Sequence, residues 1–313
     1  MNIFSPYYHT ISNRPLPHIW PLYDVVKENE FIKHIDYLAR KFDFIGPKKV
    51  LELVNGEEWA GSKPPAFLSF DDGLIECFTT IAPLLKQKGI EASFFVNPSF
   101  IDSDDIFFRY KIAVIIDALQ NGKIEKEGEL VLKEVLKASD HLKYTLEEGL
   151  LSMSFSDIED INYLMRSLIL KYRNSDIYMS SKQIQSLKND GFYIGGHSMN
   201  HPLFSELNLE DQVTQIKEST DYCQAEFAEE MRLFAFPFYD FDVRKELYPR
   251  MYNELKIDLS FGTSGINKDE FSRSIQRLSM EESFANIKSY IKRRQLHYTL
   301  KKLVGKHVIR RPQ

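Results

Sequence analysis

Apolar residues along this chain fall into two patterns that alternate. One is a short run rich in β-branched or aromatic residues, which is typical of a buried strand. Such runs lie at 66–70, 92–96, 192–194, 232–236 and 259–262. The other repeats apolar side chains every three or four positions between these runs, as expected of helices with one buried face. Strands that alternate with helices predict a mainly parallel α/β sheet, open or closed.

Several helix ends are marked by residues that suit them. Gly89 is placed to end the helix that carries the apolar positions of 78–85. Ser181 and Asn208 are placed as N-caps of the two helices that follow. The chain before Glu28 is rich in proline and aromatic residues and predicts a short strand followed by an irregular segment.

Two stretches interrupt the alternation. Residues 100–180 are helical by pattern, with one helix expected over 157–171, and they contain no recognisable motif. They predict an insertion or a cap over a site. Residues 281–313 carry nine lysines and arginines against two acids. This basic tail is interpreted as a solvated helix, with contact to an anionic membrane surface or to a lipid-diphosphate sugar as the alternative.

Composition narrows the classes of protein. The chain has 313 residues, 43% hydrophobic and 27% charged, as in soluble globular proteins. A net charge of −5 argues against a nucleic-acid partner, because such proteins usually carry a basic excess. Cys77 and Cys223 are too few for a disulfide framework. With neither a signal-peptide pattern nor a long apolar run, a cytoplasmic location is expected.

Candidate chemistry begins at Ser69-Phe-Asp-Asp-Gly73. Two adjacent carboxylates at the end of a strand could have different roles, one binding a cation and the other accepting a proton. Asp-Gly is also among the commonest hairpin turns. This segment alone does not distinguish the two interpretations.

A second motif, His197-Ser-Met-Asn-His201, follows the predicted strand at 192–194 and Gly195-Gly196. Taken alone, two histidines four positions apart could equally be surface polar residues. Together with one aspartate they would form a three-ligand site with an open position, as catalytic divalent metals require. Both motifs follow predicted strands, and the carboxyl ends of strands are where α/β folds place their chemistry.

The two motifs together resemble those of the polysaccharide deacetylase family, the NodB-like carbohydrate esterases. The family motif T/S-F-D-D-G matches 69–73, and H-S/T-x-x-H matches 197–201. The resemblance extends over about 60–100 and 180–280. It implies a distorted (β/α)7 barrel, here a single catalytic domain over 1–313 with the helical insertion at 100–180 and the basic tail at 281–313.

Residue roles follow from this resemblance. Asp71 would be the catalytic base, and Asp72, His197 and His201 would hold one divalent metal ion. Zinc is the default metal, with cobalt, nickel, iron and manganese as alternatives. A metal-bound water would then attack the amide carbonyl of an N-acetylated sugar.

The third family motif, R-x-P-Y, is altered. Ala235 stands where the family has an arginine that orients the base, and Pro237 is kept. Arg277 is the candidate replacement, with a surface arginine as the alternative. The Phe238/Tyr239 region would supply an oxyanion N–H.

The family's Leu-x-His motif, which carries the general acid, is absent from its expected place. His297 and His307 lie in the basic tail, and His9 and His18 are candidate substitutes, with a structural role as the favoured alternative. Protonated Asp71 could also return the proton. The acid is left unassigned.

The chain is therefore expected to be a metal-dependent hydrolase that removes an N-acetyl group from an amino sugar of a polysaccharide or glycolipid precursor. One alternative keeps the metal site but cleaves another amide, such as an N-formyl sugar or a cyclic amide. The other alternative is a saccharide-binding protein with impaired catalysis, which the missing arginine and Leu-x-His motif favour.

Overall fold

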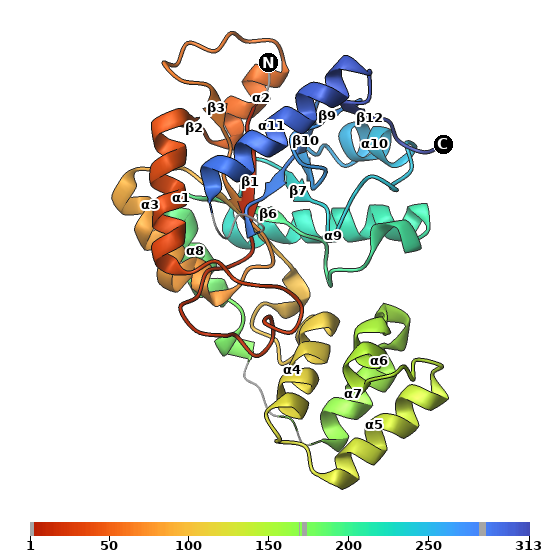
Figure 1. Cartoon of the computed structure of the whole chain (residues 1–313). Helices are drawn as coiled ribbons and strands as arrows, with labels where there is room; N and C mark the ends of the chain where they lie inside the picture. Colours follow the sequence, from red (N-terminus) through yellow and green to blue (C-terminus); the bar gives the residue numbers. More distant parts are fainter. Residues whose placement is uncertain (1–2, 169, 171–173, 282–285) are drawn as a thin grey trace.

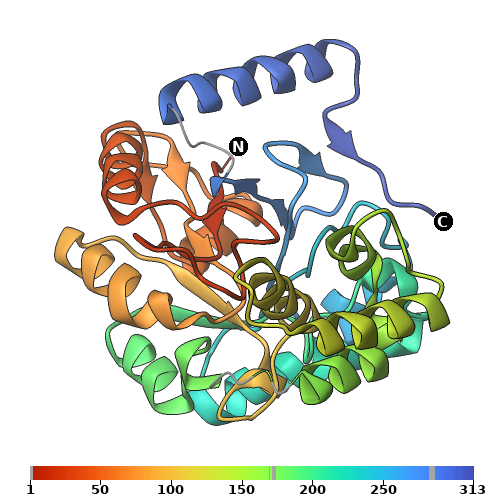
Figure 2. The same ribbon diagram turned by 60° about the horizontal axis from the view of Figure 1, so that its bottom comes forward.

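The structure is a computed structural model that describes residues 3–168, 170, 174–281 and 286–313. A ring of parallel strands wrapped by helices forms the main body, and a block of helices projects from one end of it (Figure 1). Figure 2 shows the same block from its free side, in front of the ring.

Eight parallel strands form the main sheet, in the order β10-β8-β7-β6-β5-β4-β1-β11. The strands are β1 (Pro6–Tyr8), β4 (Ser69–Phe70), β5 (Ser93–Val96), β6 (Tyr193–Gly196), β7 (Leu233–Ala235), β8 (Leu259–Gly262), β10 (Ser274–Gln276) and β11 (Leu278–Ser279). Only Arg277 separates β10 from β11, so this one run of chain pairs with β8 on one side and with β1 on the other. The sheet is thereby nearly closed. If β10 and β11 are counted as one strand, it has seven, which confirms the expected distorted (β/α)7 barrel.

The strand predicted over 66–70 is divided in two. Ala66 belongs to β3 (Pro65–Ala66), which pairs with β2 (Asp43–Phe44) outside the barrel. Ser69 and Phe70 form β4, which lies between β1 and β5. The division arises because the two ends of the run meet different neighbours. A further pair outside the barrel joins β9 (Lys268–Asp269) to β12 (Val308–Ile309).

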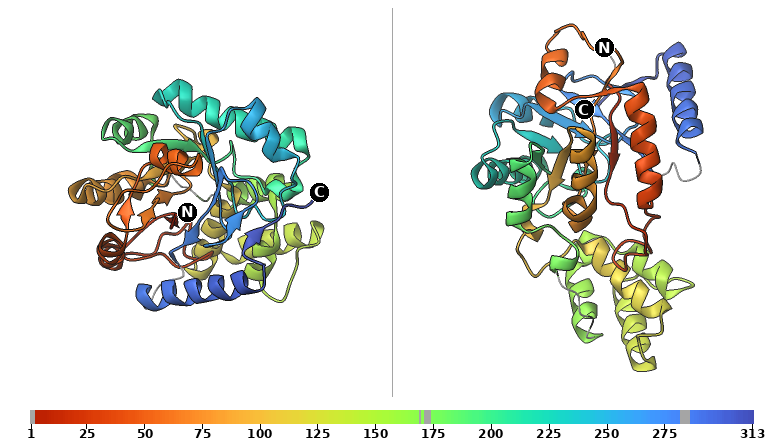
Figure 3. Two further views of the ribbon diagram at one scale, coloured as in Figure 1. Left: turned by 90° about the horizontal axis from the view of Figure 1, so that it is seen from above. Right: turned by 90° about the vertical axis from the view of Figure 1, so that its left-hand side faces the viewer.

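Helices surround the barrel, as the view along it in Figure 3 shows. They are α1 (Glu28–Lys41), α2 (Pro47–Val54), α3 (Ala82–Lys88), α8 (Ser181–Asn189), α9 (Leu209–Phe227), α10 (Leu247–Pro249) and α11 (Ile287–Leu303). Gly89 ends α3 in the left-handed conformation, and the Asn208 side chain accepts a hydrogen bond from the Asp211 N–H at the start of α9. The predicted cap Ser181 is wrong by one position, because Ser180 forms a capping box with Gln183.

The main core lies between the strands and these helices. Phe70 and Phe94 stack on neighbouring strands with ring centroids 5.1 Å apart. Apolar side chains of α1, α3, α8 and α9 pack against the same cluster. This packing fixes the carboxyl ends of β4 and β6, where both motifs begin.

The segment between β5 and β6 contains α4 (Phe108–Gln120), α5 (Lys126–Ala138), α6 (Leu146–Ser152) and α7 (Ile158–Ser167). These helices pack around an apolar cluster that includes Ile112, Leu132, Leu150 and Ile161 and continues to Leu74 at the end of the barrel. The helix expected over 157–171 corresponds to α7, and residues 169 and 171 of that prediction lie outside the described residues. The block sits at the carboxyl ends of the barrel strands, because Tyr110 of α4 bonds to Asp72 after β4.

The basic tail forms a helix, α11, along the outside of the barrel (Figures 2 and 3). Residues 282–285 of the predicted tail lie outside the described residues. Within α11 only Tyr290 and Ile291 are buried. Among the described residues no helix is long and apolar enough to cross a membrane.

Candidate active site

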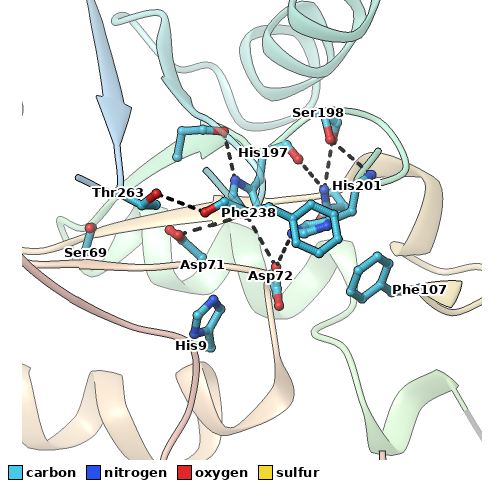
Figure 4. Close-up of polar contacts among 12 residues, drawn as sticks. His9, Ser69, Asp71, Asp72, Phe107, His197, Ser198, His201, Phe238 and Thr263 are labelled. Atoms are coloured by element: carbon cyan, nitrogen blue, oxygen red, sulfur yellow. Dashed lines mark hydrogen bonds and ion pairs between the residues drawn. The ribbon is translucent and has the colours of Figure 1, made fainter. Parts of the chain in front are cut away.

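The two sequence motifs meet at one end of the barrel (Figure 4). Asp71 and Asp72 directly follow β4, and His197 directly follows β6. Asp72 and His201 both adopt left-handed backbone conformations, with φ of 70° and 59°. Non-glycine residues seldom adopt this conformation, and it is often found at functional sites. The hairpin interpretation is wrong, because β4 pairs with β5 in parallel, and the surface interpretation is wrong, because His197 and His201 are buried.

Asp72, His197 and His201 form a cluster with the geometry of metal ligands. Asp72 Oδ1 lies 3.3 Å from His201 Nε2 and 3.4 Å from His197 Nε2. One ligand atom from each residue can be chosen so that all three lie within 4.8 Å of one another. Within the described part of the chain, Asp72 Oδ1 is buried and accepts no hydrogen bond. A buried carboxylate oxygen in this position fits a cation held between the three side chains.

Neighbouring groups orient two of these ligands. His197 Nδ1 donates to the Ala235 carbonyl at 2.8 Å, so Nε2 is the nitrogen that faces Asp72. Metal-bound histidines typically bond a carbonyl in this way through the other ring nitrogen. Tyr110 OH donates to Asp72 Oδ2 at 2.5 Å and leaves Oδ1 for the cluster. The donor set fits a divalent metal ion.

Charges around the cluster shift its pKa values. Burial acts to raise the pKa of Asp72, but the imidazoles of His201 and His197 outweigh it and hold the pKa well below its usual range. Burial lowers the pKa of His201, which favours the neutral imidazole that a metal requires.

Arg277 lies against Asp71 at the centre of the barrel. Its Nη1 and Nη2 donate to the two carboxylate oxygens at 2.6 and 2.8 Å, and Nη1 also donates to Ser69 Oγ. The guanidinium lies 4.5 Å from the Tyr7 ring centroid and is fully buried, so the surface-arginine alternative is wrong. Burial acts to raise the pKa of Asp71, but Arg277 outweighs it and the pKa is lowered. The carboxylate therefore stays ionised at neutral pH.

His9 enters the same cavity from the end of β1. Its backbone N–H and Nδ1 both bond the Glu281 carboxylate, each at 2.7 Å. Burial acts to lower the pKa of His9, but Glu281 and the two aspartates outweigh it and raise the pKa to about 10. The imidazole is therefore protonated at neutral pH, with Nε2 not engaged by Glu281.

His18, the other candidate acid, lies elsewhere. It is buried, with its pKa lowered to about 4 by desolvation, and it is absent from the lining of the cavity that holds the metal cluster. Glu281, assigned from the sequence to the basic tail, belongs to the active site, and the tail helix begins six residues later at Ile287.

The altered third motif forms one wall. Pro237 is buried, and the ring of Phe238 packs edge-on against His201 with centroids 4.7 Å apart. Thr263 Oγ1 donates to the Phe238 carbonyl and holds this loop to the end of β8. Tyr239 does not line the cavity, and its ring stacks on Phe241 instead.

The cavity has a volume of about 390 Å³, a size common for small-molecule sites. Barrel residues line one side of it, and the helical segment after β5 contributes Phe107, Arg109, Tyr110 and Leu151. The pocket is thus lined by Asp71, Asp72, His9, His197 and His201 and is covered by helices that carry no family motif.

Sequence reasoning missed Tyr110 and Glu281 as site residues. Tyr110 lies in the helical stretch 100–180, which contains no recognisable motif, and it is buried with its OH bonded to Asp72. An ionisable phenol within an apolar helical run was the available signal. Glu281 offered no such signal, because the last strand predicted from the sequence ends at residue 262.

Comparisons with known proteins agree with this architecture. Three solved structures are similar to this chain: the deacetylase PplD from Streptococcus pyogenes, IcaB from Ammonifex degensii and a de-N-acetylase from Aggregatibacter actinomycetemcomitans. Their identities to this chain are 16%, 13% and 14%, and their TM-scores are 0.57, 0.58 and 0.57. The matches cover 90%, 94% and 93% of this chain and 92%, 96% and 100% of those chains. At these identities the likeness concerns the fold.

A search of curated proteins gives no match. The family model described as polysaccharide deacetylase matches residues 60–252, which is more than half of the chain and includes both motifs. The chain belongs to the polysaccharide deacetylase family.

Proposed function

We propose that this protein is a metal-dependent hydrolase that removes the N-acetyl group from an amino sugar of a saccharide or glycolipid precursor. The observation that carries the proposal is the convergence of Asp72, His197 and His201 beside an Asp71 carboxylate held by Arg277. The family supplies the reaction class, and the cavity suits a sugar-sized group.

Asp72, His197 and His201 would hold the metal ion. Two imidazoles and one carboxylate suit zinc, and cobalt, nickel, iron and manganese accept similar donors. A divalent ion bound there would polarise the acyl carbonyl and acidify a water. The Pro237–Tyr239 loop would supply the N–H for the oxyanion, with Phe238 as the ring that faces the pocket.

Asp71 would act as the base and His9 as the acid. Water adds its oxygen to the acyl carbon while Asp71 accepts its proton, for which the ionised carboxylate is ready. The C–N bond then breaks as His9 Nε2 donates a proton to the leaving nitrogen, giving acetate and a free amine. Glu281 and Arg277 would position the acid and the base.

The main body would be the catalytic unit, with 100–180 as its cover and 281–313 as a flanking tail. Two free cysteines, Cys77 and Cys223, both buried, support a cytoplasmic location.

The outer face of α11 would touch an anionic membrane surface. Leu296, Leu300 and Leu303 are 61%, 54% and 78% exposed on one side of this helix, next to Lys292 and Arg293. Sedimentation with phosphatidylglycerol vesicles tests this contact, which the double variant Leu300→Ser/Leu303→Ser should weaken. Equal sedimentation of both proteins would refute it.

The test of the main proposal is acetate release from a panel of N-acetylhexosamine saccharides with zinc or cobalt. Asp71→Asn should abolish turnover and leave metal binding intact. Formate release from N-formyl sugars, or opening of a cyclic amide, would instead favour the alternative amide. Saccharide binding with no turnover on any substrate by the metal-loaded protein would overturn the proposal and favour the binding protein.

A further inference from the structure

A second cavity adjoins the active site beneath α11. Its volume is about 370 Å³. Tyr7, Phe238 and Thr263 line both this cavity and the metal pocket, so the two meet at these side chains. A saccharide bound at the metal could therefore extend into the second cavity.

The lining of this cavity is polar and cationic. Arg294, His297 and Lys301 come from the inner face of α11, at intervals of three and four residues. Ser264 and Asn267 face them from the loop after β8, and the lining contains no aspartate or glutamate among the described residues. In a chain with net charge −5, this cavity thus has Arg294 and Lys301 in its lining and no carboxylate among the described residues.

Lys301 and His297 have no ion-pair partner among the described residues. No carboxylate of the described residues lies within 4.0 Å of Lys301 Nζ or of the His297 ring nitrogens. The Arg294 guanidinium lies over the Tyr290 ring at 5.1 Å, which fixes its position on the wall. The site therefore offers positive charge and hydroxyl and amide donors to a ligand.

We propose that this cavity is a subsite for a phosphate or diphosphate group carried by the saccharide substrate. Arginine and lysine bind phosphate oxygens through charge-assisted hydrogen bonds, and hydroxyl and amide groups complete the contacts. The substrate class would be an N-acetylated sugar joined to phosphate, either soluble or lipid-linked. The inference rests on the proposed deacetylase function for the position of the sugar. The basic side chains of the cavity indicate that the group bound there is an anion.

The kinetic test compares matched substrates on the zinc-loaded, full-length protein. One is a neutral N-acetylglucosamine saccharide, another is N-acetylglucosamine 1-phosphate, and a third is polyprenyl diphosphate N-acetylglucosamine in detergent micelles. We expect a higher kcat/KM for at least one phosphorylated substrate than for the neutral one. The substrate preferred identifies the source of the phosphate.

The double variant Arg294→Gln/Lys301→Gln should lose about 10-fold or more in kcat/KM for the phosphorylated substrate, mainly through KM. Turnover of the neutral saccharide should be unchanged. Lys302→Gln, an exposed neighbour outside the cavity lining, is the matched control and should behave as the unmodified protein. Equal losses on both substrates, or no loss on either, would overturn the subsite.

A binding measurement separates this inference from the deacetylase proposal. Calorimetric titration with inorganic pyrophosphate should show weaker binding to the double variant than to the unmodified protein and to Lys302→Gln, all metal-loaded. Any anion bound by the metal contributes equally to all three. A difference in binding without turnover would refute the deacetylase and retain the subsite, whereas turnover with identical binding would refute the subsite alone.

Discussion

Asp71 and Asp72 are neighbours in the chain, yet their carboxylates have different partners. Asp72 faces two imidazoles and a phenol, while Asp71 receives both ends of the Arg277 guanidinium. Asp71 directly follows β4 and Asp72 adopts the left-handed conformation with φ of 70°, so the two side chains leave the backbone in different directions. A single neighbouring residue likewise determines the state of His9, because Glu281 raises the pKa of its imidazole.

The first prediction concerns this His9–Glu281 pair. Glu281 raises the pKa of His9 toward about 10, so Glu281→Gln should lower it. An acid must be protonated, so the alkaline limb of kcat/KM against pH should move down by about 1–3 pH units. Glu230→Gln, on an exposed glutamate, is the control. An unmoved alkaline limb would contradict the role of His9 as the acid.

At the scale of elements, Arg311 near the C-terminus bonds to the loop 237–240, which lines one side of the site. Arg311 bonds Asp240 and Asp269 with its guanidinium fully buried. Asp240 in turn accepts a hydrogen bond from the Thr263 N–H, next to the Thr263–Phe238 contact. The region of β9 and β12 thus stabilises the position of the loop that carries Phe238, through Arg311, Asp240 and Thr263.

The second prediction follows from that burial. Arg311→Ala would leave two buried carboxylates without their cation, and it should lower the free energy of unfolding by about 3–5 kcal/mol. Arg310→Ala, at the exposed neighbouring position, should change it by less than about 0.5 kcal/mol. Urea denaturation measures both. Similar midpoints for the two variants would show that the buried pairs do not stabilise the fold.

At the scale of the whole molecule, the helical block and the barrel share one site. Tyr110 of α4 reaches Asp72 across the boundary, and Phe107 packs on His201 with centroids 4.3 Å apart. The apolar cluster of the block continues to Leu74 and Phe238 at the end of the barrel, so the block holds these side chains over the barrel as a preformed cover.

The third prediction tests that connection. Tyr110→Phe removes one hydrogen bond to a proposed metal ligand and should weaken metal affinity by about 10-fold or more. Tyr163→Phe, on an exposed tyrosine of α7 in the same block, is the control. Competition with a chromogenic chelator gives both affinities. Equal affinities would mean that the phenol does not support the ligand.

The sequence by itself determined a mainly parallel α/β sheet and the two motifs that follow its strands, and the family resemblance implied that the sheet closes into a barrel. Periodicity predicts buried strands and amphipathic helices from local sequence. Each motif, 69–73 and 197–201, is a short continuous segment at the end of one strand, so it can be recognised without knowledge of the fold. The predicted roles of Asp71, Asp72, His197 and His201 remain predictions for experiment. Their positions in one buried cluster agree with them.

Only the tertiary structure decided the partners of the two acids. Arg277 meets Asp71 across 206 residues, and Glu281 meets His9 across 272. These contacts depend on β1 lying between β4 and β11, which places the ends of three strands side by side. No local pattern encodes that order, because it is set by packing of the whole barrel. The same closure brings Arg294 and Lys301 of α11 beside the pocket that Asp72, His197 and His201 line.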